Sequence, residues 1–236
     1  MSLLSMYQRI SWPGWLEMYR RELPQPVEVL NLIDYGDREQ FLWYGLFVVP
    51  TIYGLGGGVQ WSGEWQASLL GERQAEALLL VRYPSHRRFM LMVTNPYYAL
   101  INLFRQNGEA HFEASFTQPE GDPQVLRRER QLLVAHCDDE AQATSIKQLL
   151  AKAGAEKVYA VHEVAAFDFF REYSPSDPNP LRMKRALFFR PGPLSEGLTD
   201  ALGLKLQSQA PGLSLQIYRR QSRKAMLPQP LSRLFN

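Results

Sequence analysis

The chain has 236 residues, of which 45% are hydrophobic and 21% charged, proportions that exclude a disordered or fibrous protein. Its net charge of +2 is too small for a dedicated nucleic-acid-binding protein, which needs a strongly basic face. No run approaches the roughly 20 apolar residues that cross a membrane, and the first residues lack a secretory signal. We therefore expect a cytoplasmic protein with neither nucleic acid nor membrane as a partner.

The only cysteine, Cys137, excludes an intrachain disulfide and a cysteine-based metal cluster. His136, Cys137, Asp138 and Asp139 are consecutive, but neighbouring residues of a strand point in opposite directions. We therefore predict no metal site, with an aspartate capping the next helix and Cys137 buried as a small apolar side chain. Basic residues concentrate near the C-terminus, and 221–236 is predicted to be a solvated basic tail.

Hydrophobic periodicity and turn residues predict the order β-α-β-β-α-β after an N-terminal helical segment over 1–26. The expected elements are a helix over 3–22 broken at Pro13, a strand over 27–35, a helix from about 38 that Pro50 kinks or ends, strands over 59–68 and 75–83, a helix from Pro84-Ser85 that Asn95-Pro96 interrupts and that resumes over 97–105, and a strand over 110–117. This order is the split βαβ unit of a ferredoxin-like fold.

The same order of elements recurs after a linker over 119–123. The expected elements are a strand over 131–137, a helix over 140–153, a strand over 157–164, a Pro-rich excursion over 172–181, a strand over 184–190, a short helix over 193–202, and a strand over 213–220. The predicted fold class is therefore α+β, with two tandem ferredoxin-like (βαββαβ) units over 27–118 and 124–220.

A ferredoxin-like sheet carries helices on one face and leaves the other face bare. Exposing that apolar face would forfeit roughly 25 cal/mol for each Å² left in water. Packing the two sheets face to face would cover both bare faces and form an α/β barrel within one chain. The cavity between the sheets is the predicted place for a ligand.

Phrases in the first half resemble a known family over roughly 27–117. They are Val29-Leu30-Asn31-Leu32-Ile33, Asp37 with Tyr44 and Pro50, Leu55-Gly56-Gly57, Trp61-Ser62-Gly63-Glu64, Val81-Arg82-Tyr83-Pro84-Ser85 with Phe89, and Met92-Val93-Thr94-Asn95-Pro96-Tyr97 with Arg105. The first half resembles the short dimeric α/β-barrel proteins of unassigned function, which are related in fold to EthD-type and quinol monooxygenase proteins. The resemblance implies a barrel of two ferredoxin-like units and no particular reaction. The second half lacks these phrases and would act as a built-in partner, which favours a monomer or a weak homodimer.

Strand alternation supplies the candidate site residues. If the leucine and phenylalanine faces of the first and fourth strands meet the helices, then Asn31, Tyr35, His111 and Glu113 line the cavity between the sheets. The His111–Glu113 pair is the candidate for acid–base catalysis, because an imidazole beside a carboxylate titrates near neutral pH. The alternative is that these polar side chains simply face water.

Further ligand-binding candidates depend on the register of the second strand, which the sequence leaves open. Either Gln60 and Glu64 or Trp61 and Trp65 join the cavity, and the tryptophan face would suit a planar ligand. Arg82 is the remaining ligand-binding candidate. The Gly-rich run over 54–58 follows a helix and precedes a strand, the reverse of a phosphate-binding loop.

Two functions are compatible with these patterns. The first is a protein that binds or converts a small organic molecule in the cavity, as a cofactor-free oxygenase or isomerase by analogy of fold. The second is a non-catalytic interaction module that uses the N-terminal helix or the basic tail. No cofactor is expected, with haem held by His162 or His111 as the alternative, and the sequence does not decide whether the chain is an enzyme.

Overall fold

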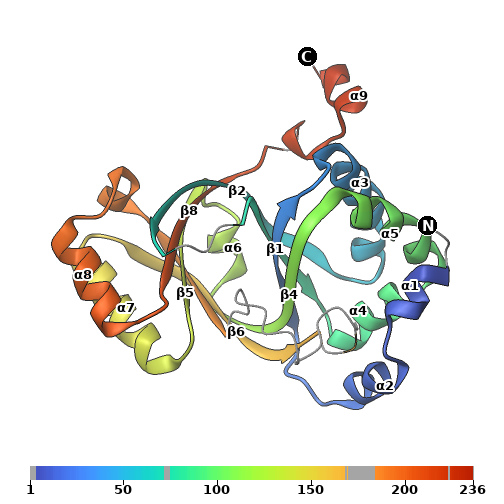
Figure 1. Cartoon of the computed structure of the whole chain (residues 1–236), viewed down its shortest axis with the longest axis horizontal. Coiled ribbons are helices and arrows are strands. Elements are labelled where there is room, and N and C mark those ends of the chain that lie inside the picture. Colours follow the sequence, from blue (N-terminus) through green and yellow to red (C-terminus); the bar gives the residue numbers. More distant parts are fainter. Residues whose placement is uncertain (1–3, 72–74, 168, 170–183, 223, 236) are drawn as a thin grey trace.

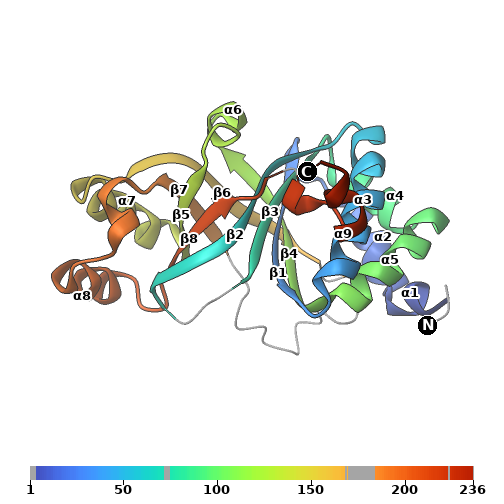
Figure 2. The same cartoon turned by 90° about the horizontal axis from the view of Figure 1, so that it is seen from above.

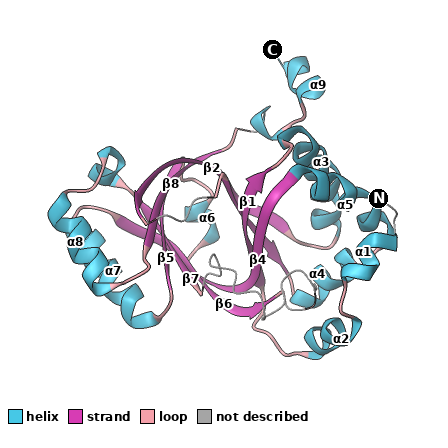
Figure 3. Cartoon of the chain, viewed as in Figure 1, coloured by secondary structure: helices cyan, strands magenta, loops and turns pink. Residues whose placement is uncertain are grey.

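The computed structural model describes residues 4–71, 75–167, 169, 184–222 and 224–235. Strands within these residues close into one antiparallel barrel in the order β1-β3-β2-β8-β5-β7-β6-β4 (Figures 1 and 3). The strands are β1 Val27–Tyr35, β2 Gly58–Leu70, β3 Ala77–Tyr83, β4 Glu109–Glu120, β5 Gln131–Cys137, β6 Glu156–Ala166, β7 Arg185–Arg190 and β8 Ser214–Arg220.

The barrel consists of two four-stranded sheets of the same topology. The first half has the order β4-β1-β3-β2 and the second half the order β6-β7-β5-β8, so each has its first strand beside its third and fourth. Antiparallel pairing of β2 with β8 and of β4 with β6 joins the halves. The prediction of two ferredoxin-like units forming a barrel within one chain is confirmed.

Most of the helices lie at the two ends of the molecule, outside the barrel, whereas α6 lies between these ends and buries Leu126 among the side chains of the barrel interior. Figures 1 and 2 show α1–α5 gathered against the first half, and α7 and α8 against the second half. The helices are α1 Leu4–Arg9, α2 Trp12–Arg20, α3 Arg38–Gly54, α4 His86–Val93, α5 Pro96–Gly108, α6 Pro123–Leu126, α7 Glu140–Lys152, α8 Asp200–Gln209 and α9 Gln229–Ser232, with 3-10 turns η2 Gly192–Glu196, η3 Lys224–Met226 and η4 Arg233–Phe235. Of the helices described, none is long and apolar enough to cross a membrane.

Side-chain caps fix where several helices begin. Asp37 accepts a hydrogen bond from the amide of the third residue of α3 at 3.2 Å, and Asn95 accepts one from the second residue of α5 at 2.8 Å. Asp139 accepts one from the Gln142 amide at 2.8 Å, which confirms the predicted aspartate cap of α7. Each cap satisfies an amide that has no partner inside its helix.

Two prolines lie elsewhere in their elements than predicted, and Pro50 does not end its helix. The break between α1 and α2 comes before Pro13, which lies in the first turn of α2, where its missing N–H costs nothing. Pro50 lies inside α3, which continues for another turn. Pro119 belongs to β4 and pairs with Val161 of β6, so the strand extends into the predicted linker.

The predicted helix over 193–202 is replaced by η2 and α8, which runs to Gln209. Gly197 separates the two, with a φ of 130° that only glycine adopts readily. The predicted excursion over 172–181 lies outside the described residues.

The core has three layers, because the barrel is packed both inside and outside. The first-half helices cover the outer faces of β1, β3 and β4, and α7 and α8 cover those of the second half. Large buried side chains fill the barrel interior between the sheets: Leu30, Leu32, Trp61, Leu78, Leu80, Leu132, Val134, Tyr159, Val161, Phe188 and Tyr218. Strand β1 is therefore apolar on both faces, with Val29 outward and Leu30 inward.

Candidate functional site

A largely apolar cavity of about 350 Å³ lies beneath α3. We call it the tail pocket, because the C-terminal segment forms one wall. It lies between α3, the outer face of the first-half sheet, and Met226 and Leu227. Its lining residues are Ile33, Tyr35, Phe41, Leu42, Tyr44, Gly45, Leu46, Val48, Val49, Pro50, Ile52, Val59, Ser62, Ala77, Leu79, Gln221, Met226 and Leu227. This volume falls in the range of small-molecule sites.

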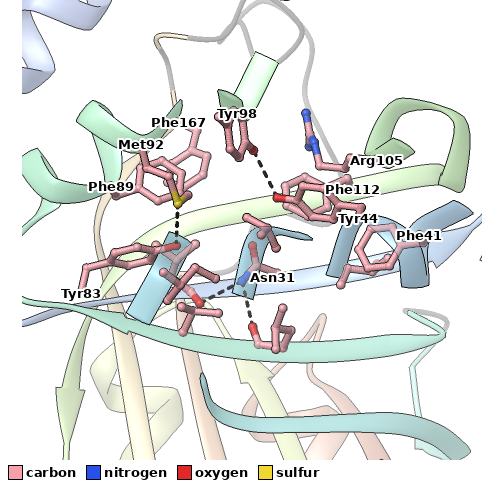
Figure 4. A pocket seen from close by; sticks show the side chains of 16 residues that line it. Asn31, Phe41, Tyr44, Tyr83, Phe89, Met92, Tyr98, Arg105, Phe112 and Phe167 are labelled. Carbon is pink, nitrogen blue, oxygen red and sulfur yellow. Dashed lines mark hydrogen bonds between the residues drawn. The ribbon is translucent and has the colours of Figure 1, made fainter. Parts of the chain in front are cut away.

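A second, smaller cavity of about 50 Å³ lies deeper between the same sheet and α3, α4 and α5 (Figure 4). We call it the inner chamber. Its room corresponds to a few water molecules. Six side chains line both cavities, namely Ile33, Phe41, Tyr44, Val48, Ile52 and Leu79. The two cavities are therefore neighbours that share one wall beneath α3.

Asn31 is the polar group of the sheet in the inner chamber. Its Nδ2 donates hydrogen bonds to the carbonyl oxygens of Val29 and Leu79, each at 3.0 Å (Figure 4). Because both neighbours are acceptors, they fix which end of the amide is the nitrogen. Its Oδ1 accepts no hydrogen bond from another described residue. Asn31 therefore offers one acceptor to a ligand that carries a donor.

Tyrosine hydroxyls supply the other polar groups of the chamber. The hydroxyls of Tyr44 and Tyr98 lie 3.2 Å apart, and the Tyr83 hydroxyl donates to Met92 Sδ at 3.9 Å (Figure 4). Burial raises the pKa of Tyr44 and of Tyr83 well above the ordinary value. Both phenols therefore stay protonated near neutral pH, and the Tyr44–Tyr98 pair keeps one O–H that can donate a hydrogen bond to a ligand.

Arg105 closes one side of the chamber with its charge compensated. Its Nε donates to Asn102 Oδ1 at 2.7 Å, and its Nη1 lies 3.1 Å from Glu109 Oε2. The guanidinium also lies over the Phe112 ring, 4.8 Å from the centroid. Arg105 therefore belongs to an ion pair of the wall and does not present a bare positive charge to a ligand.

The mouth of the tail pocket carries a polar cluster on Gln221. Gln221 Nε2 donates to Glu64 Oε1 at 3.2 Å and to the Tyr35 hydroxyl at 3.5 Å, and its Oε1 accepts from the Ser62 hydroxyl. Farther along, the Gln229 amide donates to both carboxylate oxygens of Glu39 at 3.0 Å. The segment predicted as a solvated tail is thus held against the first half and closes the pocket.

The structure separates the predicted site residues onto two faces of the sheet. Asn31, Tyr35 and Glu64 lie on the outer face, because they pair with or contact residues that pack beneath the helices. Trp61, Arg82, His111 and Glu113 lie on the inner face, toward the barrel interior. This corrects the predicted arrangement, in which Asn31, Tyr35, His111 and Glu113 face one cavity between the sheets.

The prediction failed because it assigned the two faces of β1 the wrong way round. The prediction placed its leucine face against the helices, yet Leu30 and Leu32 point into the barrel, and Val29 and Ile33 meet the helices. Both faces of this strand are apolar, so alternation could not tell one from the other. On β4 the predicted side is right, with Phe116 beneath the helices.

The inner-face residues fall into separate contacts. Arg82 forms an ion pair with Glu28 Oε1 at 3.0 Å, and the Tyr159 hydroxyl donates to the same oxygen at 2.8 Å. Glu28 is fully buried, and burial raises its pKa above the ordinary value despite these partners. No hydrogen bond joins His111 to Glu113, both of which the structure describes, so their acid–base role stays a prediction.

Cys137 is buried as expected of a small apolar side chain, with 5% of its surface exposed. Burial, the largest cause, raises the pKa of its thiol to about 12. We expect native protein at a pH of about 8 to leave 5,5′-dithiobis(2-nitrobenzoic acid) unreacted for hours, and guanidinium-unfolded protein to react within minutes. Rapid stoichiometric reaction of the native protein would contradict this burial.

A metal ion needs several ligating side chains close together. The described residues contain no group of three or more His, Cys, Asp or Glu side chains that could hold one. His162 Nδ1 lies 3.2 Å from Glu120 Oε1, an arrangement that ligating histidines use. Neither His162 nor His111 lines the tail pocket or the inner chamber, however. The apolar cavities described here therefore do not fit haem held by either imidazole.

No family model matches the chain. No curated protein matches it in sequence.

Solved structures similar to the chain are distant in sequence. A protein of unknown function from Rhodopseudomonas palustris is 23% identical over 44% of this chain and 89% of its own length, with a TM-score of 0.40. An anthrone oxidase-like protein is 10% identical over 84% of this chain and 92% of its own, with a TM-score of 0.48. A haem-binding protein from Thermus thermophilus is 10% identical over 87% of this chain and 98% of its own, with a TM-score of 0.38. Likenesses of this size do not identify a ligand for this chain.

Proposed function

We propose that this protein binds a small, largely apolar organic molecule beneath α3, in the tail pocket and the adjoining inner chamber. The observation that carries the proposal is the tail pocket itself, about 350 Å³ in volume and lined almost wholly by apolar side chains. Small-molecule sites are apolar cavities of this size with few polar groups that fix orientation. Here those groups are Tyr35, Ser62 and Gln221 at the mouth, with Asn31 in the chamber.

The lining defines the chemistry of the ligand. Aromatic side chains such as Phe41 and Tyr44 favour a flat ring system, because rings pack well against rings. The free acceptor on Asn31 requires a hydroxyl or N–H on the ligand, and the phenols suit a ligand carbonyl. A polycyclic aromatic or polyketide-like compound with one or two oxygen substituents fits this description.

The residues that line the two cavities support binding of a ligand better than its chemical conversion. No carboxylate or imidazole lines the tail pocket or the inner chamber in the described part of the chain. An isomerase needs such a group to move a proton. A cofactor-free oxygenase would likewise have to act on a compound that loses its proton without help from the protein. His111 and Glu113, the acid–base pair predicted from the sequence, lie on the opposite face of β4.

The proposal is tested with the neutral dye N-phenyl-1-naphthylamine, whose fluorescence rises in apolar surroundings. We expect saturable binding of one dye per chain and weaker binding in Asn31→Leu, which removes the acceptor without emptying the site. His111→Ala serves as the comparison and should bind as the unmodified chain does. Absence of saturable binding would contradict the proposal. A Soret band in the absorption spectrum of the gently purified protein would contradict the poor fit of haem.

Removal of the C-terminal wall should speed exchange of the bound dye. Deleting 223–236 removes Met226 and Leu227, which cover the tail pocket, while deleting 230–236 leaves both in place. We expect the first deletion to raise the dissociation rate of the dye about tenfold, since lost apolar contact of roughly 1.4 kcal/mol has that effect. Stopped-flow displacement measures both rates. Equal rates in the two deletions would show that the tail is not a wall of the site.

The interaction-module hypothesis has one specific observation in its favour. Trp12 and Leu16 of α2 are 49% and 41% exposed. The rest of the N-terminal segment is built into the first half, since Met18 is buried and Trp15 stacks on Tyr19 with ring centroids 5.0 Å apart. A docking role is therefore proposed for the exposed pair alone. It predicts that Trp12→Ala with Leu16→Ala abolishes recovery of a partner in pull-down and leaves dye binding unchanged.

A further inference from the structure

The outward sides of α3 and α5 form an aromatic, uncharged surface. Both helices lie at the first-half end of the molecule, opposite α7 and α8 (Figures 1 and 2). We call this surface the aromatic face, and its six side chains are Trp43, Phe47, Tyr97, Leu100, Leu103 and Phe104. None of these six described residues lines the tail pocket or the inner chamber. The aromatic face is therefore separate from the proposed ligand site.

Contacts between the side chains join the two helices into one surface. Tyr97, Leu100 and Phe104 recur every three or four residues, so they lie along one side of α5. On α3, Trp43 stacks on Phe47 with ring centroids 5.8 Å apart. The Phe47 ring lies 5.6 Å from that of Phe104, and the Tyr97 hydroxyl donates to the Phe47 carbonyl oxygen at 3.3 Å. The aromatic face is therefore continuous across α3 and α5.

The aromatic face departs from the usual pattern of a surface helix, which turns polar side chains to water. Tyr97 is 46% exposed and Leu100 is 50% exposed, and the other four side chains are partly exposed. Over 40–54 α3 has no charged residue, and the single charge of α5 is Arg105, which is buried. Helix α7 of the second half follows the usual pattern, with Lys152 among its exposed residues. The outward side of α3 and α5 is thus suited to being covered.

The area of the aromatic face is sufficient for a dimer. An aromatic side chain has about 150–250 Å² to bury, so the six side chains together leave roughly 350 Å² exposed. Apolar patches of about 300–600 Å² often mark a functional surface. Two copies packed through this face would bury roughly 700 Å² of apolar surface. The uncharged rim, which includes Gln40, Thr51 and Asn107, brings the contact past the total of about 1,000 Å² expected of a biological interface.

Charge favours a second copy of the chain over a lipid surface as the partner. In a two-fold symmetric dimer the same patch of each chain meets the other, so charges of one sign within it would face each other. The aromatic face contains none. Helices that lie on membranes carry Lys and Arg beside their apolar side. Residues 1–120 contain no Lys and have nine Arg against twelve Asp and Glu, a net charge of 9 − 12 = −3, which anionic lipids would repel.

We propose that the chain forms a symmetric homodimer through the aromatic face. The described strands close into one barrel, so two copies have to associate through helices and loops instead of a sheet edge. Packing removes both aromatic faces from water at once, and aromatic side chains are enriched in such interfaces. Because the six side chains line neither cavity, dimer formation is independent of the proposed binding of an apolar ligand beneath α3.

The test is sedimentation velocity of the full chain over a range of concentrations, which separates the 27.2 kDa chain from a dimer of twice that mass. We expect a reversible dimer for the unmodified chain. Association should weaken at least about 100-fold in Leu100→Glu and in Leu100→Lys, because either charge would be buried without a partner. Leu204→Glu is the matched control, since Leu204 is 69% exposed on α8, and it should dimerise as the unmodified chain does.

Leu100 is half exposed, so neither substitution is expected to disturb the fold, which circular dichroism checks, and dye binding beneath α3 should not change. A monomer at every concentration would overturn the proposal. A dimer that Leu100→Glu weakens no more than Leu204→Glu would also overturn it, because the copies would then associate through another surface. Flotation with neutral phosphatidylcholine vesicles tests the other partner. Vesicle binding by a monomeric chain that is lost in Leu100→Glu would assign the aromatic face to a lipid surface instead.

Discussion

Replacing Gly45 by phenylalanine is expected to abolish dye binding in the tail pocket. Gly45 lines the pocket from α3, and a Cβ atom there would meet no heavy atom within 4 Å. The benzyl group can therefore enter the cavity without straining the fold, and glycine is the least favourable ordinary residue inside a helix. Because a ligand would have to displace this group from a packed site, we expect affinity to fall at least about 100-fold.

Gly203 provides the matched control. It lies inside α8 on the second half, and a Cβ there also meets nothing within 4 Å. Gly203→Phe therefore makes the same change in a helix far from the pocket, and its dye affinity should equal that of the unmodified chain. Full dye binding by Gly45→Phe, with the fold checked by circular dichroism, would show that the dye binds elsewhere.

Replacing Glu28 by alanine is expected to destabilise the fold by about 3 kcal/mol, the largest stability change that we predict for a single side chain. Glu28 has no exposed surface and joins the halves, because it contacts Arg82 of β3 and Tyr159 of β6. Its removal leaves a partly buried guanidinium and a buried hydroxyl without their acceptor. Chemical denaturation measures the loss. A cost below about 1 kcal/mol would show that this cluster does not hold the halves together.

Glu28→Gln separates charge from hydrogen bonding at the same position. The amide oxygen keeps an acceptor for Tyr159 and Arg82, so we expect most of the stability to be retained. The pKa of Glu28 is higher in the folded chain than its ordinary value of 4.5, so the folded state holds the proton more tightly. The stabilisation of the fold that comes from this tighter proton binding is fully present below pH 4.5 and is lost as the pH rises through the pKa of Glu28 in the folded chain. Glu28→Gln should remove this decline, and an unchanged pH profile would contradict the raised pKa.

Local chemistry made the fold predictable from the sequence. Strand β5, the start of α3 at Arg38 and the aspartate cap of α7 lie where turn residues and periodicity placed them, because those signals act within a few residues. The end of η2 and the start of α8 were mistaken for one helix, since Gly197 in a helical pattern reads as a tolerated break. Pro50 was allowed to end α3, although helix interiors accept proline when neighbouring contacts compensate.

The candidate site was harder to predict, because its position depends on which face of a doubly buried strand meets the helices. Asn31 was selected as an unusual strand residue and lines the inner chamber, yet it was assigned to the barrel side. Phe41, Tyr44 and Tyr98 resemble ordinary core residues of amphipathic helices, and nothing in their spacing marks a cavity. Met226 lies in a segment that charge alone assigned to solvent. Nothing in the sequence marks Glu28 as buried, since an acidic residue in a strand is normally expected to face water.

The most direct test of a ligand beneath α3 is native mass spectrometry of gently purified protein, with Gly45→Phe and Gly203→Phe prepared in parallel. We predict that the unmodified chain and Gly203→Phe carry the same stoichiometric adduct of a small organic molecule, and that Gly45→Phe carries none. The same adduct on all three proteins would place the ligand outside the tail pocket and contradict the proposed function.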